Sequence, residues 1–136
     1  MEARRLYEDV EMNTIPKINL VIMCYKKIIE LLREAIEDIE NGRYDKKSGS
    51  LSKAIAILTE LMSALDFKRG KQIAYGLNNI YLYCLNKIIE ADSRDESDAL
   101  RDVIDILEDI NDAWIRISKK ELNRNIQYNR LRVRSA

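Results

Sequence analysis

The segment that decides the fold is Ile73–Ala91, which reads IAYGLNNIYLYCLNKIIEA. Read as a helix at 100° per residue, it carries one apolar stripe and a second group of apolar residues well outside that face. The first stripe consists of Ile73, Leu77, Ile80, Cys84, Ile88 and Ala91, and the second group of Tyr75, Tyr81, Leu82, Leu85 and Ile89. A small helical bundle needs only the first stripe. We therefore expect the second group to be buried in a dimer, covered by the chain's own ends, or bound by a helix of another protein.

The composition favours a single all-α domain. The chain has 136 residues, 46% of them hydrophobic and 34% charged, with only one proline and four glycines to interrupt helices. Its longest apolar run, Leu20–Tyr25, is far shorter than a membrane span, and its first residues lack the apolar core of a secretory signal. We therefore expect one cytoplasmic domain over residues 1–136, with a core at about 14–118 and a tail at about 120–136 that is helical or flexible.

Apolar residues at helical spacing predict four helices. Thr14 is the expected cap of the first helix, with Pro16 in its first turn, and Asn41 and Gly42 are expected to end it. The predicted ranges are about Ile15–Glu40, Ser50–Leu65, Gly70–Ala91 and a fourth helix capped by Asp95 or Ser97. Short connections place successive helices antiparallel. The predicted fold is an up-down-up-down four-helix bundle with a short N-terminal lid and an extension after about Lys120.

The first helix has the same apolar excess as the third. Ile18 opens its core stripe, whereas Leu20, Cys24 and Leu31 lie about 220° from the start of that stripe. On the fourth helix we expect Trp114 to point inward, together with Leu100, Ile104, Leu107 and Ile117. The apolar surplus of the first and third helices is the most informative feature of the chain.

Catalysis and cofactor chemistry find little support in the sequence. The chain contains no histidine, which removes histidine-based nucleophilic arrangements and the histidines of two-metal helical bundles. Cys24 and Cys84 lie within helical patterns and are expected to be buried thiols rather than a disulfide. We therefore expect no enzyme activity, no metal and no cofactor.

The charges balance overall but are unevenly distributed. Lys and Arg number 23 and Asp and Glu also number 23, so no global attraction to nucleic acid or anionic lipid is expected. The segment 90–112 is strongly acidic, and residues 119–136 are strongly basic. Solvated helix faces explain both runs, and nucleic-acid binding through the basic tail remains an alternative.

Two parts of the chain resemble the FliS family of flagellin-export chaperones. In the first half the resemblance rests on Thr14, on Tyr7 upstream of it, and on the run Leu20–Tyr25. In the second half it rests on Glu60-Leu61, Leu65-Asp66, Gly70, Ile73-Ala74, Leu77, Ile80-Tyr81-x-Tyr83, Ile89-Glu90-Ala91 and Ala113-Trp114. The chain departs from the family pattern at Lys71, where the family has a second glycine, and at Leu82, which occupies a usually polar place.

The resemblance implies a cytoplasmic bundle that binds the disordered carboxy-terminal segment of flagellin. Such a chaperone blocks premature filament assembly and keeps flagellin ready for type III export, with the export apparatus as a further partner. The terminal segment would bury its apolar face on the surplus stripes. The expected contacts are Leu20, Cys24 and Leu31 on the first helix and Tyr75, Leu82 and Leu85 on the third, with Tyr7 as a lid. The alternative is a self-associating structural bundle with no flagellin client, so the chain is a monomer or a homodimer.

Overall fold

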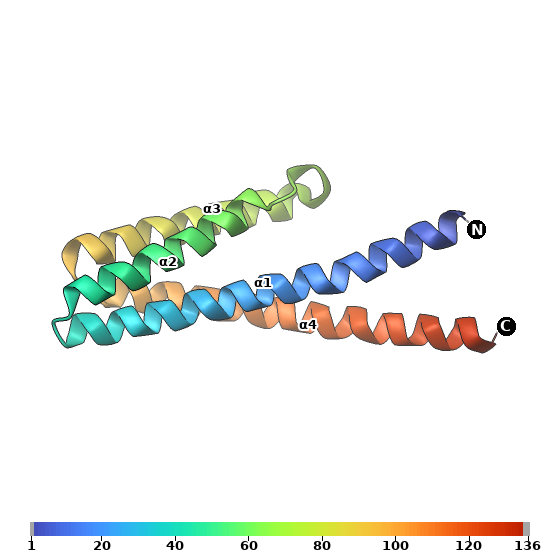
Figure 1. Ribbon diagram of the computed structural model, residues 1–136. Helices are drawn as coiled ribbons and strands as arrows, with labels where there is room; N and C mark the ends of the chain where they lie inside the picture. Colours follow the sequence, from blue (N-terminus) through green and yellow to red (C-terminus); the bar gives the residue numbers. More distant parts are fainter. Residues whose placement is uncertain (1, 135–136) are drawn as a thin grey trace. The chain divides into compact units, whose positions relative to one another are not determined.

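The structure is a computed structural model that describes the backbone of residues 2–134 and the side chains of residues 15–134 (Figure 1). It contains four α-helices joined by short connections, with no strand in the described part of the chain. The helices are α1 (Glu2–Glu40), α2 (Tyr44–Ser63), α3 (Phe67–Arg94) and α4 (Asp98–Arg134). The prediction of an all-α four-helix fold is confirmed. None of the described helices combines the length and hydropathy needed to cross a membrane.

The chain groups into two compact units. The first, Cys24–Asp109, contains the later part of α1, all of α2 and α3, and the start of α4. Its connections are too short for anything but antiparallel neighbours, and α2 and α3 lie side by side (Figure 1). This unit is the four-helix bundle. The second unit combines residues 1–23 of α1 with residues 110–136 at the end of α4. The prediction of a single domain stays a prediction.

The predicted start of α1 is wrong. The helix does not begin at Ile15 under a Thr14 cap but runs from Glu2 through Pro16 without interruption. A proline inside a helix removes one backbone hydrogen bond and crowds the preceding turn. The residues before Pro16 are mostly good helix formers, such as Glu2, Ala3 and Leu6, and they extend the helix toward the N-terminus.

The other helix ends follow recognisable local chemistry. α1 ends at Glu40, directly before Asn41-Gly42 as predicted, and Gly42 adopts a positive φ of 72°. Asp66 caps α3, because its Oδ1 accepts hydrogen bonds from the backbone N–H groups of Lys68 and Arg69, each at 3.1 Å. At the other end of α3, Asp95 is left-handed, with a φ of 53°. The basic tail, left open between helical and flexible, is helical as far as Arg134.

The entry to α3 contains a strained residue. Lys71 has a φ of 46° and a ψ of −122°, inside a segment that is otherwise helical from Phe67 to Arg94. This conformation suits glycine, because a Cβ atom crowds the backbone there. Gly70 precedes it and has no room for a side chain, since an added Cβ would lie 2.8 Å from the Cβ of Ala74. The irregular turn therefore uses one glycine and one lysine at adjacent positions.

The core of the bundle unit is aliphatic around one tyrosine pair. Tyr25 of α1 and Tyr81 of α3 are both buried, and their hydroxyl oxygens are 2.5 Å apart in a hydrogen bond. Their rings meet edge to face, with centroids 6.1 Å apart. Burial raises the pKa of Tyr81, and the neighbouring Tyr25 adds to the effect. The fully buried aliphatic side chains include Ile28, Leu32, Leu51, Leu58, Ile88, Leu100, Val103 and Leu107.

Four predictions of burial or exposure are wrong. The sequence predicts Leu31 on the surface, but it is only 2% exposed, because α1 buries a wide arc that includes Ile28 and Ala35. Tyr81 belongs to the core rather than to the surplus. Conversely, Ile73 was expected in the core but is 73% exposed, since it lies two residues after the irregular Lys71. On α4, Ile117 is exposed as well, about 120° around the helix from the buried Asn111.

Candidate binding surface

An exposed apolar stripe runs along α3 within the bundle unit. Tyr75, Leu82 and Ile89 are 59%, 40% and 50% exposed, and Leu85 between them is half-buried. At 100° per residue the four side chains lie within about 80° of one another, over about 21 Å of helix. We call these four residues the α3 stripe. Asn78 lies in the same sector between Tyr75 and Leu82, so the apolar side chains are densest from Leu82 to Ile89. An exposed apolar stripe of this kind is typical of a site for another apolar surface.

The stripe exists because α3 is apolar on two sides. Its inward side is already filled by Ala74, Tyr81, Cys84, Ile88 and Ala91, all of which are buried. The helix therefore satisfies the bundle without Tyr75, Leu82 or Ile89. These side chains are surplus to the core, as the sequence predicted for Tyr75, Leu82 and Leu85.

The stripe continues into an aromatic pair at the start of α3. The rings of Phe67 and Tyr75 are 4.7 Å apart at their centroids, and both side chains are exposed. On another side of the helix, the Lys87 ammonium lies over the Tyr83 ring at 5.6 Å from its centroid. Exposed aromatic side chains such as Phe67 and Tyr75 are enriched at protein interfaces.

The α1 candidates divide into exposed and buried side chains. Leu20 is exposed, as predicted, and the neighbouring Met23 is exposed too although the sequence reasoning did not select it. Cys24 is half-buried, and burial raises the pKa of its thiol, with a smaller contribution from the Glu60 carboxylate. Leu31 leaves the candidate set because it is part of the core. Met23 could have been found from the same helical spacing, since it lies about 60° from Leu20.

The lid candidate lies outside the described side chains. Tyr7 falls within the continuous backbone of α1, between Glu2 and Glu40. Its side chain lies outside the described residues, so its role as a lid stays a prediction.

The reactive groups of the bundle are held in structural roles. Burial raises the pKa of the Cys84 thiol to about 11, so this sulfur stays protonated at neutral pH. The buried Lys47 ammonium donates to the Asp92 carbonyl oxygen at 2.8 Å and pairs with the carboxylates of Asp92 and Asp95. Burial alone would lower the pKa of Lys47, but the hydrogen bonds to Asp95 and Asp92 outweigh it and raise the value. This contact ties the start of α2 to the end of α3.

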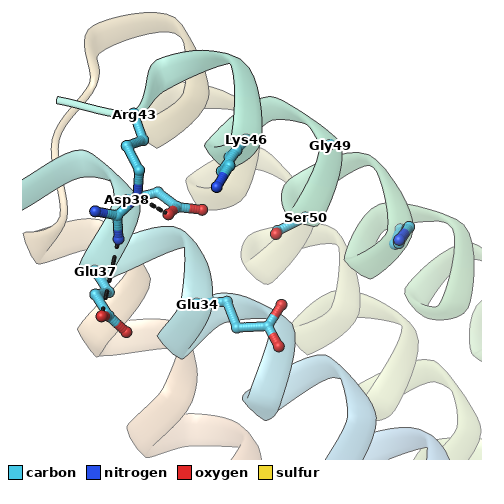
Figure 2. Close-up of a pocket in the computed structure, with 8 residues that line it drawn as sticks. Glu34, Glu37, Asp38, Arg43, Lys46, Gly49 and Ser50 are labelled. Atoms are coloured by element: carbon cyan, nitrogen blue, oxygen red, sulfur yellow. Dashed lines mark hydrogen bonds and ion pairs between the residues drawn. The ribbon is translucent and has the colours of Figure 1, made fainter. Parts of the chain in front are cut away.

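A surface pocket between α1 and α2 is also structural. It has a volume of about 350 Å³, and its walls carry acids from α1 and bases from α2 (Figure 2). Arg43 crosses it, with its Nε 2.9 Å from Asp38 Oδ1 and its guanidinium 3.8 Å from the Glu37 carboxylate. Arg43 therefore pairs with two of the acids that line the pocket. In the described part of the chain no group of three or more acidic, cysteine or histidine side chains is placed to hold a metal ion.

The described chain is a small four-helix protein with an exposed apolar stripe, and comparison with known proteins places it in a family. The family described as "Flagellar protein FliS" matches residues 1–121. The flagellar secretion chaperone FliS of Salmonella typhimurium is 35% identical over 114 residues, which cover 83% of this chain and 84% of the relative. The Vibrio cholerae chaperone of the same name is 28% identical over 114 residues, 84% of each chain. The Bacillus subtilis chaperone is 26% identical over 115 residues, 85% of each chain.

The chain belongs to the FliS family of flagellar secretion chaperones. The resemblance seen in the sequence is thereby confirmed.

Proposed function

We propose that this chaperone acts in the cytoplasm, where it binds the disordered carboxy-terminal segment of flagellin. Binding prevents premature polymerisation and keeps flagellin competent for type III secretion through the flagellar export apparatus. The role requires no catalysis. Membership of the FliS family supports the export role, and the α3 stripe is the observation that carries the proposed binding.

The stripe suits a client that folds as it binds. An amphipathic segment that orders on the surface would cover Leu82, Leu85 and Ile89 with its own apolar face. Covering a side chain that is about half exposed contributes about 1 kcal/mol, or half of the value for full burial of a leucine or isoleucine. Part of this gain is offset by the loss of chain entropy as the client orders, so several such contacts are needed.

The proposed contact set is revised by the structure. It keeps Tyr75, Leu82 and Leu85 on α3, adds Ile89, and keeps Leu20 and Cys24 on α1 with Tyr7 as the lid. Leu31 is removed because its side chain is sealed in the core.

Calorimetry with a peptide from the carboxy terminus of the organism's flagellin tests the proposal. We expect one peptide per chain and a negative heat-capacity change, the mark of apolar burial. Ile89→Asp should weaken binding at least about tenfold, because the new carboxylate would be desolvated without a partner. Ile73→Asp is the control, since Ile73 is also an exposed isoleucine of α3 but lies about 160° away from Ile89.

Light scattering separates this proposal from the structural alternative. A tight dimer that ignores the peptide would favour a self-associating bundle and contradict the proposal. A chain that takes up one peptide, and loses this ability on Ile89→Asp but not on Ile73→Asp, supports it.

A further inference from the structure

The end of α4 repeats the spacing of a coiled-coil seam. Positions 115, 119, 122, 126, 129 and 133 are separated alternately by four and three residues, the 4-3 spacing of a and d positions. These positions hold Ile115, Lys119, Leu122, Ile126, Asn129 and Val133, which we call the α4 seam. All of them belong to the second compact unit, and all but the half-buried Ile115 are exposed.

The seam contains an open hollow of the kind that accepts a knob. Four of the residues lining it are Ile126, Asn129, Arg130 and Val133, at positions i, i+3, i+4 and i+7 of the helix. In coiled coils, four residues in this arrangement form the hole into which one side chain of the facing helix inserts. Arg134 completes the lining. The geometry is that of one half of a helix pair.

The charges beside the seam favour an acidic partner. Lys119 lies in the seam itself, and Arg130 occupies the adjoining e position, where coiled-coil helices form ion pairs with their partner. From residue 113 onward Glu121 is the only acid in the sequence, and it pairs with Arg124 at 2.9 Å. The helix dipole accounts for the bases of the last turn, Arg132 and Arg134, but not for Arg130 or for the apolar seam.

The occupant is therefore neither a second copy nor a polyanion. Two copies would bring Lys119 and Arg130 of one chain close to the same cations of the other. A nucleic acid would use the cations, but it would leave Leu122, Ile126 and Val133 in water. A lipid surface would bury the apolar face of the helix at the acyl boundary, and in this segment Lys119 and Asn129 lie within that face.

We propose that residues 115–134 of α4 dock one helix of another protein, with an apolar a/d seam and glutamate or aspartate at its edges. Most of this surface lies beyond residue 121, outside the part of the chain that matches the family, and it is distinct from the α3 stripe. The chaperone thus has a second docking surface besides the one proposed for flagellin.

A three-heptad peptide tests the seam directly. The probe has leucine at a and d and glutamate at e and g, and a matched peptide has lysine at e and g. The full chain should bind the glutamate peptide and discriminate at least about tenfold against the lysine peptide. Arg130→Glu should reduce that discrimination at least about threefold. Fluorescence anisotropy measures the binding of each peptide. No binding, or equal affinity for both peptides, would overturn the proposal.

Two isoleucines with equal exposure on α4 provide the control. Ile126 and Ile117 are each 42% exposed and lie on opposite sides of the helix, nine residues or about 180° apart. Ile126→Asp should lower the affinity for the glutamate peptide at least about tenfold, whereas Ile117→Asp should change that affinity less than about twofold. Equal effects of the two substitutions would contradict the proposal that the α4 seam binds the peptide.

Measurements on the same variants separate this inference from the proposed function. Ile126→Asp should leave affinity for the flagellin peptide unchanged, because Ile126 is not part of the α3 stripe. If the wild-type chain dimerises and Ile126→Asp abolishes the dimer, the seam binds a second copy and the proposal is wrong. The proposal is also wrong if the chain binds duplex DNA or phosphatidylserine vesicles more tightly than the glutamate peptide.

Discussion

Helices α2 and α3 belong to the same bundle unit but use their apolar residues differently. α2 buries Leu51, Ala54, Leu58 and Leu61 on one side, and its only large apolar side chain described as exposed is Tyr44 at its first position. α3 buries a stripe of similar size and exposes Tyr75, Leu82 and Ile89 as well. The difference shows that the exposed residues of α3 are not needed to build the bundle. They are available for binding.

The largest expected effect contrasts one leucine from each helix. Leu58→Ala in α2 should lower the free energy of unfolding by about 3 kcal/mol, because Leu58 is fully buried and its removal leaves a cavity. Leu82→Ala in α3 should lower it by only about 1 kcal/mol, since that side chain is already 40% exposed. Urea denaturation measures both values. Similar losses would mean that the α3 stripe is part of the core after all.

The second prediction concerns the inward side of α3 and uses pH. The pKa of Cys84 is raised to about 11 by burial, from an ordinary value of 9.0, so the unfolded chain loses this proton first as the pH rises. Its contribution to stability is complete below pH 9 and is lost as the pH rises through 11, amounting to about 2 kcal/mol by pH 11.

A comparison of the wild type with Cys84→Ala across this pH range isolates the contribution of the Cys84 thiol to the free energy of unfolding. Cys84→Ala should lose less stability than the wild type between pH 8 and pH 11, whatever its stability at pH 8. Denaturant titrations at several pH values measure the difference. Parallel curves for the two proteins would contradict the burial of Cys84 as the cause.

The smallest expected effect concerns the irregular entry of α3. Lys71→Gly should raise the free energy of unfolding by about 1 kcal/mol, because glycine adopts the positive φ of this position without strain. Gln72→Gly at the next position is the control and should lower stability by about 1 kcal/mol, since residue 72 follows the irregular turn within α3. Thermal unfolding monitored by circular dichroism distinguishes the two. A loss of stability in both variants would show that the entry is helical in solution.

The sequence predicts the helices better than it predicts their ends and their orientation. Asn41-Gly42 ends α1 as expected, because glycine readily adopts the left-handed conformation. Pro16 misleads, since proline favours the first turn in general, but one lost hydrogen bond does not stop a helix whose preceding residues mostly favour it. Periodicity alone therefore locates a helix without fixing where it starts.

Helical periodicity also predicts part of the candidate surface. An apolar pattern almost all around α3 identifies surplus residues, and Tyr75 and Leu82 are indeed exposed. Which side of a helix is surplus depends on how many neighbours it contacts, and this is a tertiary property. Leu31 was misjudged because α1 buries a wide arc, and Tyr81 because it pairs with Tyr25 across the core.

Site-specific photo-cross-linking in cells tests the central claim most directly. A photoreactive phenylalanine derivative placed at Leu82 should cross-link to the carboxy-terminal segment of flagellin, because the α3 stripe is covered when the client is bound. The same group at Ile73, also exposed on α3 but outside the stripe, should give little or no cross-linked flagellin. Equal cross-linking from both positions, or none from Leu82, would contradict the account.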